Sequence, residues 1–439
     1  MKKTATYTVM AVLVAIVLVG CGHRAGQIEM GADNYGKAVL DNGITILVNY
    51  DETTSLTAAR VQIGGGVLTE TAENNGITNL MTNMLLKGNT EMSASEITER
   101  LDFLGANVSV DCSRDYSYIS FVCLSENLEE VFDIIARSIT SPTFPEAELT
   151  KLKLQVEGNI KAEGDNQAQA CSKLFFATMY GNEGYGLPAL GTVESIENIH
   201  IEDIKEHYRA LIGGNNIIFS IATNLSPQRI PALVDNRLGG IEPDIDSKIE
   251  PSLKLQENKE GFISFERNQS FIYMGFALPH LSLKEAAYIT LLNEVMGNNV
   301  GSRLWYLRQK EKLAYAVYTQ YAFDKYGAMF RAAIGTDTSK VAQALSSLDR
   351  EWNLLAEKGL AEQELVDAKV NMKNNLIYRI DRKSSRAASM ATSEWSGYNY
   401  RFVLELIDAA DAITLDEINE FAKNKLTVEN RYVSIVGKK

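Results

Sequence analysis

The sequence predicts an α/β protein made of two similar halves. Its 439 residues exceed the ~100–200 residues typical of one domain. Hydrophobic residues make up 45% of the chain and charged residues 23%, a balance typical of a protein with a packed core. The same order of elements (strand pair, helix, hairpin, helices, strand) occurs twice, which indicates an internal duplication. We expect one half over residues 35–242, a linker over 243–260 and the other half over 261–439.

Alternating and periodic apolar residues define the elements of the first half. Ser93-Ala94-Ser95-Glu96 is a capping-box pattern, in which a serine and a glutamate satisfy free amides at a helix start. A polar turn over residues 51–54 is expected to join the first two strands. The expected strands lie at 39–50, 56–63 and 216–222, a hairpin at 108–123, and helices at 76–86, from 93, at 128–138, 145–180 and 201–211.

The second half repeats these signals after a polar stretch. Capping boxes begin at Ser282 and Thr414, each followed three residues later by a glutamate. Alternating residues predict strands and periodic residues predict helices. The expected strands lie at 262–278, 314–323, 328–336 and 431–436, and the helices from 282, at 339–359, 361–396 and from 414.

Three cysteines, Cys112, Cys123 and Cys171, lie in the body of the chain. An oxidising compartment permits disulfides, but a hairpin turn centred on Arg114 would pair Cys112 with Tyr116. Cys112 and Cys123 would then lie far apart along the ladder, beyond the ~7 Å limit for a bridge. All three are therefore expected to be buried as small apolar side chains.

The first 20 residues resemble a bacterial lipoprotein signal peptide. Two lysines precede an apolar run over residues 10–19, which is too short to span a bilayer. The run ends in Leu-Val-Gly-Cys at 18–21, which resembles a lipobox, so Cys21 would take the lipid; an ordinary signal peptide is the alternative. No aspartate follows Cys21. We therefore expect a polar tether over residues 21–34 and anchoring to the outer membrane, on its periplasmic side.

The net charge of −13 argues against nucleic acid as a partner, because phosphate recognition requires basic patches. Two glycine-rich segments, at 63–67 and 297–301, could suggest phosphate-binding loops. Neither precedes Lys-Ser or Lys-Thr and neither fits Gly-x-Gly-x-x-Gly, so both are expected to be turns.

Several segments, in order along the chain, carry a resemblance to a known family. Met-Gly-Asn-Asn-Val-Gly-Ser-Arg-Leu at 296–304 and Leu-Arg-Gln-Lys-Glu-Lys-Leu-Ala-Tyr-Ala-Val at 307–317 resemble the C-terminal signature of the pitrilysin/insulinase-type zinc metallopeptidases. This family includes the mitochondrial processing peptidase. Leu-Pro-Ala-Leu-Gly-Thr at 187–192 is similar to the family's Pro-x-x-Gly-Thr segment. Asp-Asn-Gly-Ile at 41–44 and Tyr-Val-Ser-Ile-Val-Gly at 432–437 resemble its opening and closing strands.

The resemblance implies two α/β halves that face each other like a clam shell around a chamber for a peptide. Active members carry His-x-x-Glu-His on a first-half helix, where both histidines bind zinc and the glutamate activates water. Here Met-Leu-Leu-Lys-Gly at 84–88 resembles the segment that follows this motif and fixes the register. The motif positions are Asn79, Thr82 and Asn83, which suit neither zinc nor general-base catalysis.

The family's third zinc ligand is a downstream glutamate, which would fall at Glu157 or Gly158; one residue of register separates the two. A single carboxylate does not hold zinc, so neither metal nor another cofactor is expected in this chain. The histidines are never three or four residues apart, as a helical metal pair requires: His23, His200, His207 and His280.

The second-half machinery of the family is retained. Arg308 and Tyr315 match its Arg-x₆-Tyr pattern, whose tyrosine donates toward the developing oxyanion and whose arginine holds substrate carbonyls. As alternatives, Arg308 could pair with Glu311 on a helix face and Tyr315 could simply pack in a strand. The resemblance also implies substrate contact from the loop residues Gly297, Asn298, Asn299 and Gly301.

This combination resembles the non-catalytic chain of the heterodimeric members of the family. We expect a subunit, not an enzyme by itself, that completes the active site of a homologous partner carrying zinc. An extended peptide would add as a strand to a sheet edge, and the membrane would be contacted through the lipid anchor only. Two alternatives remain, a stand-alone peptide-binding or chaperone-like lipoprotein and an assembly scaffold.

Overall fold

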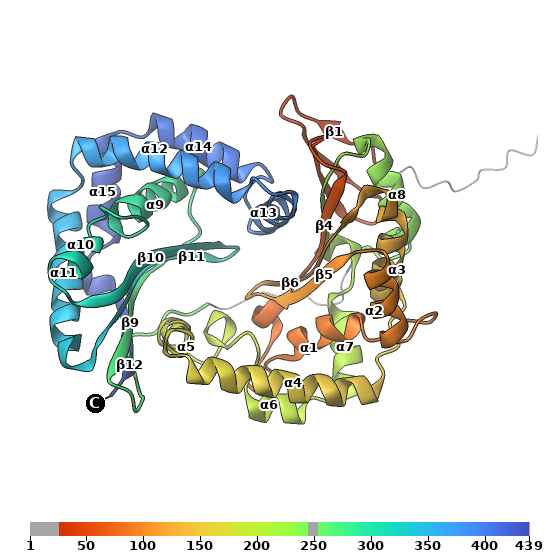
Figure 1. Ribbon diagram of the computed structural model, residues 1–439, viewed down its shortest axis with the longest axis horizontal. Helices are drawn as coiled ribbons and strands as arrows, with labels where there is room; N and C mark the ends of the chain where they lie inside the picture. The colour runs from red at the N-terminus through yellow and green to blue at the C-terminus, as the bar shows by residue number, and fades with distance from the viewer. Residues whose placement is uncertain (1–25, 245–252, 439) are drawn as a thin grey trace, which may run out of the picture.

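The computed structural model describes residues 26–244 and 253–438, which form two α/β halves, each built on one sheet (Figure 1). The predicted fold class is confirmed. The expected signal peptide and Cys21 lie outside the described residues. Within those residues, no helix is long and apolar enough to cross a membrane.

The first sheet has seven strands in the order β1-β2-β3-β7-β4-β6-β5. Strand β1 falls in the segment expected to be a tether and pairs with β2, so the ordered chain begins before residue 35. The strands are β1 (Glu29–Met30), β2 (Tyr35–Val39), β3 (Thr45–Tyr50), β4 (Leu56–Gly64), β5 (Asn107–Cys112), β6 (Tyr116–Leu124) and β7 (Ile217–Thr223).

Residues 39–50, expected to be one strand, belong to two strands that turn at Gly43. Gly43 has a φ of 90°, which favours glycine, and a Cβ there would lie 1.8 Å from Asn215 Oδ1. The strands on either side of residues 51–54 are also not neighbours. Strand β7 lies between them, parallel to β3 and antiparallel to β4.

The hairpin of β5 and β6 differs by one residue from the expected register. The Ser113 N–H donates to the Tyr116 carbonyl at 2.7 Å. The turn is therefore centred between residues 114 and 115, and Cys112 pairs with Ser117 rather than with Tyr116. The cysteines that the structure describes are free and buried: Cys112, Cys123 and Cys171.

Helices α1 to α8 belong to the first half, and the sequence pattern did not predict α6 and α8. The helix expected over 145–180 breaks at Asn166, whose Oδ1 accepts hydrogen bonds from the N–H groups of Ala168 at 3.0 Å and Gln169 at 3.2 Å. The helices are α1 (Ile77–Leu85), α2 (Ala94–Phe103), α3 (Leu128–Thr140), α4 (Glu146–Asp165), α5 (Gln167–Tyr180), α6 (Val193–Asn198), α7 (Ile201–Leu211) and α8 (Ile230–Leu238).

The second sheet has five strands in the order β10-β11-β9-β12-β8. The helix expected over 361–396 breaks at residues 380–382, and α14 was not predicted. The strands are β8 (Glu260–Ser264), β9 (Gln269–Leu278), β10 (Ala314–Asp324), β11 (Gly327–Asp337) and β12 (Tyr432–Gly437). The helices are α9 (Leu283–Met296), α10 (Trp305–Gln309), α11 (Val341–Lys358), α12 (Glu362–Arg379), α13 (Lys383–Trp395), α14 (Phe402–Ala412) and α15 (Leu415–Lys425).

The predicted capping boxes are confirmed at the starts of α2, α9 and α15. At α9, for example, the Ser282 N–H donates to the Glu285 carboxylate at 2.9 Å, and the Glu285 N–H donates to Ser282 Oγ at 3.3 Å. Each box supplies partners for amides that the helix itself leaves free.

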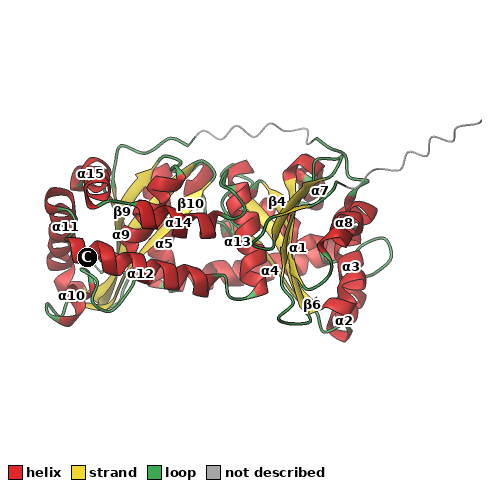
Figure 2. Ribbon diagram, turned by 90° about the horizontal axis from the view of Figure 1, so that it is seen from above, coloured by secondary structure: helices red, strands yellow, loops and turns green. Residues whose placement is uncertain are grey.

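Each half contributes one helix to the sheet of the other half. Helix α5 of the first half packs on β8, β9 and β12, and α13 of the second half packs on β3, β4 and β7 (Figures 1 and 2). Lys383 Nζ anchors the start of α13 by donating to the carbonyls of Asp51 at 2.7 Å and of Thr54 and Leu56 at 2.9 Å. We call α5 and α13 the exchanged helices. They hold the two halves as one unit.

The end of the expected linker is packed against both halves. The Gln256 N–H donates to the Met179 carbonyl at 2.9 Å, and the Tyr432 hydroxyl donates to the Gln256 carbonyl at 2.9 Å. Strand β8 begins at Glu260, the last residue assigned to the linker. Residues 245–252 lie outside the described part of the chain.

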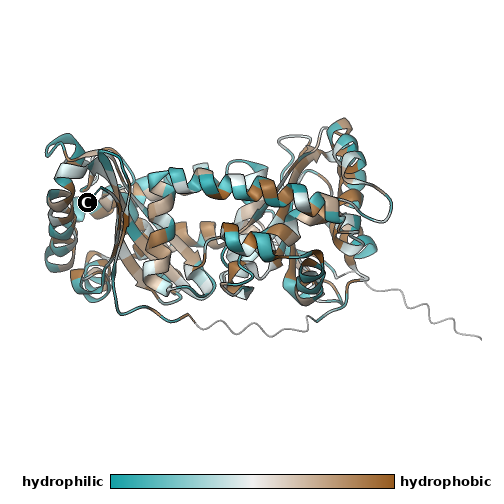
Figure 3. Cartoon of the chain, turned by 90° about the horizontal axis from the view of Figure 1, so that it is seen from below, coloured by the Kyte–Doolittle hydropathy of each residue, from teal (hydrophilic) through white to brown (hydrophobic). Residues whose placement is uncertain are grey.

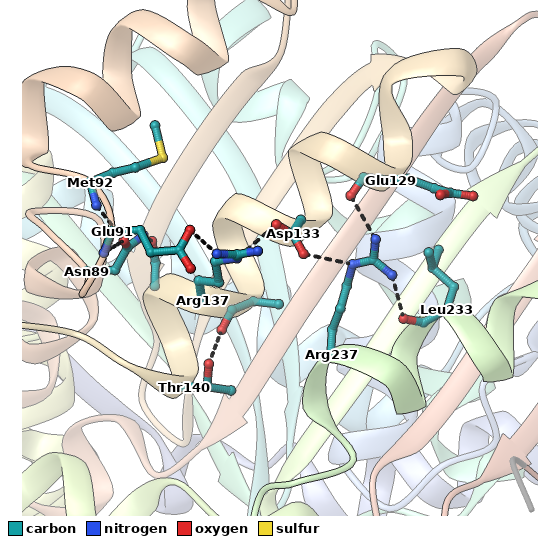
Figure 4. Close-up of polar contacts among 11 residues, drawn as sticks. Asn89, Glu91, Met92, Glu129, Asp133, Arg137, Thr140, Leu233 and Arg237 are labelled. Carbon is teal, nitrogen blue, oxygen red and sulfur yellow. Dashed lines mark hydrogen bonds and ion pairs between the residues drawn. The ribbon is translucent and has the colours of Figure 1, made fainter.

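The helices on the outer surface alternate between polar and apolar residues (Figure 3). On α3, Arg137 Nε lies 2.8 Å from Asp133, and Arg237 Nε of α8 lies 3.5 Å from the same carboxylate (Figure 4). Arg137 also pairs with Glu91. These pairs are half-exposed, so each adds little stability, and the apolar face of α3 in the first core holds it in place.

Candidate functional site

Helix α1 carries the degenerate zinc-motif positions and begins at a buried carboxylate. Glu70 accepts hydrogen bonds from the N–H groups of Gly76 at 2.8 Å and Thr78 at 2.9 Å, and from Asn75 Nδ2 at 2.8 Å. Burial raises the pKa of Glu70, and these hydrogen bonds oppose the rise. A carboxylate at this position satisfies free amides and complements the positive end of the helix. Glu70 therefore fixes where α1 starts.

The side chains at the three motif positions are satisfied inside the helix. Asn83 Nδ2 donates to the Asn79 carbonyl at 2.9 Å and to Asn79 Oδ1 at 3.1 Å. Thr82 Oγ1 donates to the Thr78 carbonyl at 2.7 Å. Asn79 and Thr82 are buried, with 4% and 0% of their surface exposed. These contacts are those of a packed helix.

The residues at α1 do not fit zinc. Their amide and hydroxyl groups are weak ligands compared with imidazole, thiolate or carboxylate. In the described ranges, no group of three or more His, Cys, Asp or Glu side chains is placed to hold a metal ion. The chain's own α1 therefore offers no hydrolytic metal centre.

The position of the family's third ligand lies on α4, which packs beside α1. Gly158 is exposed, and a Cβ there would meet no atom within 4 Å. Glu157 is half-buried. Burial lowers the pKa of Lys153, and the charge of the Glu157 carboxylate opposes this decrease. The choice between Glu157 and Gly158 stays open, and either leaves α1 without a ligand set.

One histidine contacts α1. His207 Nε2 of α7 lies 2.8 Å from Thr78 Oγ1. Burial lowers the pKa of His207 to about 4, so the ring is neutral at physiological pH. The sequence offered no helical metal pair for this residue, and the structure places it at the α1–α7 contact. A single imidazole without a second ligand is a packing contact here.

Arg308 is exposed on α10, and its guanidinium carbon lies 4.8 Å from the centre of the Trp305 ring. The alternative pairing of Arg308 with Glu311 is not formed. Glu311 instead binds Arg350 at 2.5 Å and Ser347 Oγ at 2.8 Å. The guanidinium of Arg308 is thus positioned by an aromatic face and keeps its donors accessible.

Tyr315 occupies a β-bulge at the start of β10. The pairing with β11 passes from Ala314–Thr336 to Ala316–Gly335, which leaves Tyr315 as the extra residue. Bulges redirect a side chain relative to the sheet. Tyr315 is 46% exposed, so it does not simply pack in the strand. Burial of the remaining part raises the pKa of its hydroxyl, which keeps its proton at neutral pH.

The glycine-containing loop before α10 is held by a buried carboxylate. Glu294 accepts hydrogen bonds from Asn298 Nδ2 at 2.7 Å and from Asn375 Nδ2 at 3.0 Å, and its carbonyl accepts one from Asn299 Nδ2 at 3.2 Å. Burial raises the pKa of Glu294. Gly297 is required, because a Cβ there would lie 2.6 Å from the backbone nitrogen of Thr319. Gly301 has a φ of 109°, and a Cβ there would meet no atom within 4 Å.

The structure brings the loop, Arg308 and Tyr315 into one region but does not bring them to α1. Helix α10 packs on β10 in the second half. Helix α1 lies in the first half, far from α10 in two perpendicular views (Figures 1 and 2). The degenerate zinc motif and the Arg/Tyr segment therefore do not face each other within one chain.

Sequence reasoning missed two features of functional interest. One is the bulge at Tyr315, which depends on the distant Gly335. The other is a cavity of about 460 Å³ between the halves, to which both contribute aromatic and arginine side chains. No local motif marks either feature, because each is assembled from segments far apart in the sequence.

Two family models match the chain. Residues 45–193 match the family described as insulinase (peptidase family M16), and residues 198–372 match the peptidase M16 inactive domain. An uncharacterized zinc protease, YmxG, from Bacillus subtilis is 26% identical over 396 residues, which cover 88% of this chain and 94% of the relative. The non-peptidase homolog YmxG of Helicobacter pylori is 24% identical over 404 residues, covering 91% and 93%.

Solved structures share the fold. A peptidase M16 inactive domain from Pseudomonas fluorescens superposes with a TM-score of 0.85 at 18% identity, covering 92% of this chain and 98% of that one. A chain of complex III2 from Candida albicans superposes with a TM-score of 0.80 at 17% identity, covering 91% and 95%. With nearly all of residues 45–372 matched by the two family models, the chain belongs to the insulinase-type peptidase family M16.

Proposed function

We propose that this chain is the non-catalytic subunit of a two-chain peptidase and completes the active site of a zinc-bearing homologous partner. The observation that carries the proposal is the separation of its two segments. Helix α1 offers no zinc ligands, while Arg308 and Tyr315 are exposed on α10 and at the start of β10. Helix α10 lies far from α1 (Figure 1). Side chains remote from their own α1 are free to act on another molecule.

The chemistry of the exposed pair suits this role. The protonated Tyr315 hydroxyl can donate a hydrogen bond to an oxyanion as it develops, and the Arg308 guanidinium can hold a substrate carbonyl. Zinc bound by the partner would supply the activated water. The present chain would bind and orient the peptide and stabilise the charge that forms.

A free sheet edge supports peptide binding. Among the described strands, β5 pairs only with β6, and it packs beside α1. The residues Asn107, Ser109 and Asp111 along it are exposed. An extended peptide can add to such an edge through its main chain, with modest demands on sequence. The loop that Glu294 anchors would contact substrate separately, near Arg308.

The experiment is co-expression with a homologue that retains His-x-x-Glu-His, followed by purification and a peptide hydrolysis assay with and without chelator. Tyr315→Phe and Arg308→Ala should leave the complex intact and each lower kcat by roughly 10²–10³. Tyr306→Phe is the matched control, because Tyr306 is also an exposed tyrosine of this segment, at 52% exposure. Wild-type cleavage by both variants would show that the site is not shared.

The proposal includes attachment to the periplasmic face of the outer membrane through a lipid on Cys21. Cys21→Ser should then move the protein from the membrane fraction to the soluble fraction without changing its melting temperature. Mass spectrometry of the mature N-terminus gives an independent check. An unmodified Cys21 would contradict this part alone.

A stand-alone peptide-binding role is the second candidate, and the cavity between the halves favours it because one chain supplies all of its lining residues. This role requires no partner. Tight peptide binding by the purified chain, together with failure of every His-x-x-Glu-His homologue to form a complex, would decide for it.

A further inference from the structure

A cavity of about 460 Å³ lies between the two halves, apart from α1, Arg308 and the loop before α10. Strands β4 and β6 line it from the first half, and β10, α12, α13 and α14 line it from the second. Its volume falls within the ~300–1,000 Å³ typical of pockets for small ligands or chain ends. Its aromatic lining residues are Tyr116, Tyr118, Tyr321, Phe323, Tyr398 and Phe402.

The lining carries positive charge in a protein whose net charge is −13. Arg60 and Arg379 line the cavity, and none of its described lining residues is an aspartate or glutamate. Arg379 is exposed, and its guanidinium carbon lies 5.8 Å from the centre of the Tyr321 ring. Two cations that line one recess attract an anion and raise its local concentration.

Arg60 is the strongest indication of a ligand. It is 9% exposed, its Nε donates to Ser120 Oγ at 2.9 Å, and its guanidinium carbon lies 3.7 Å from the centre of the Tyr118 ring. Within the described part of the chain Arg60 forms no ion pair; the Tyr118 side chain hydrogen-bonds to it, and the charge of Asp111 acts on it without a direct ion pair. A buried cation without a counter-ion is costly. A carboxylate in the cavity would offset that cost and match the planar donor geometry of the guanidinium.

The remaining walls suit an apolar group next to that carboxylate. The Tyr398 and Phe402 rings stack with their centres 4.1 Å apart, and those of Tyr321 and Phe323 are 5.0 Å apart. On the facing helix α13, hydroxyl groups recur every four residues and so share one side of the helix, at Ser385, Ser389 and Ser393. The cavity thus combines an anion site, an aromatic wall and hydrogen-bonding groups.

We propose that this cavity binds the free C-terminal residue of a peptide, with the α-carboxylate held by Arg60 and the last side chain against the aromatic wall. Arg379 attracts the carboxylate from the exposed end. The choice of a peptide as ligand rests on the proposed function, whereas the carboxylate site follows from the lining residues. Recognition of a chain end would let the protein distinguish finished or cleaved peptides from internal segments.

The test measures binding of labelled decapeptides ending in Phe to the purified full chain by fluorescence anisotropy. Three forms are compared: a free C-terminal carboxylate, a C-terminal amide, and an amide with an internal aspartate. We expect the free acid to bind about tenfold or more tightly than either amide. Equal binding of the free acid and the plain amide would overturn the proposal. Equal binding of the aspartate-containing amide and the free acid would overturn the assignment to the chain end.

Arg60→Gln should remove the difference between the free acid and the amide while leaving amide binding unchanged. Arg100→Gln is the matched control, because Arg100 is an exposed arginine of the same half, paired with Glu130. Thermal melting checks that Arg60→Gln is folded. If it is not folded, the role of the cavity in binding the carboxylate is tested in two other ways: by the three peptides on the wild-type chain, and by the exposed variant Arg379→Gln. An undiminished preference for the free acid in folded Arg60→Gln would overturn the role of Arg60.

The same measurements separate this inference from the proposed function. Selective binding of the free acid by a chain that never supports a partner's cleavage would overturn the proposed function alone. Equal binding of acid and amide by a chain that does support cleavage would overturn this inference alone.

Discussion

The Tyr315 ring lies directly over the backbone of Gly335 on the neighbouring strand. A Cβ on Gly335 would be 2.3 Å from the Cζ atom of the ring and 2.6 Å from its hydroxyl oxygen. The bulge that turns Tyr315 out of the regular ladder and the absence of a side chain at residue 335 therefore act together. The orientation of the hydroxyl depends on both.

Gly335→Ala should displace the Tyr315 ring and lower the activity of a reconstituted peptidase pair about tenfold or more, because a donor moved by about 1 Å no longer meets the oxyanion. Partner binding should persist. Gly164→Ala on α4 is the control, because a Cβ there would meet no atom within 4 Å. Unchanged turnover by Gly335→Ala would mean that the ring's position over Gly335 has no catalytic role.

The hairpin tips of the two halves meet at an acidic pair, of which Asp115 is buried and Asp324 half-buried. Asp115 accepts hydrogen bonds from the Tyr185 hydroxyl at 2.9 Å and the Lys325 N–H at 3.0 Å, and the other half contributes Asp324 beside it. Burial, together with the charge of Asp115, raises the pKa of Asp324 from 3.8 to about 7, against the opposing charge of Arg114. The folded state therefore holds this proton more tightly than the unfolded chain does.

This contribution to stability is fully present below about pH 4 and is lost as the pH rises through about 7. Asp324→Asn has no titrating carboxyl at this position and should not lose this stability as the pH rises. Its free energy of unfolding relative to that of the wild type should therefore rise by roughly 2 kcal/mol between about pH 5 and about pH 8. Urea unfolding at both pH values measures it, with the exposed carboxylate variant Asp408→Asn as control. A pH-independent difference would contradict the raised pKa.

His207 provides an opposite pH dependence. Burial lowers the pKa of His207 from 6.5 to about 4, so the unfolded chain binds this proton more readily than the folded protein does. The contribution of neutral His207 to the free energy of unfolding is therefore fully present above pH 6.5 and is lost as the pH falls toward 4. NMR titration should show His207 still neutral at about pH 5.5. Thr78→Val, which removes its partner, should cost about 1 kcal/mol and leave the pKa low, because burial causes the shift. Titration near the ordinary histidine value in the folded protein would exclude the buried ring.

Local chemistry predicted much of the fold. The capping boxes at Ser93, Ser282 and Thr414 marked helix starts because both partners lie within four residues of each other. Where pairing is not local, prediction was weaker: β7 separates β3 from β4, and no residue near 51–54 signals a strand that arrives more than 160 residues later.

The candidate site was predictable only in part, for the same reason. Arg308 and Tyr315 could be named from their spacing, but their separation from α1 depends on how the halves pack. Arg60 carries no motif at all. Its isolation from carboxylates becomes visible only when β4, β6, α12 and α13 are assembled around one cavity.

The exchanged helices affect how the protein can be made. The sheet of the first half lacks the cover of α13 on one face until the ribosome has completed residue 395, more than 170 residues after β7. Likewise, α5 presents its buried aromatic residues Phe175 and Phe176 before β9 and β12 exist to receive them. Neither half expressed alone would bury its own surfaces, and a cut chain whose two pieces had already folded together would not come apart.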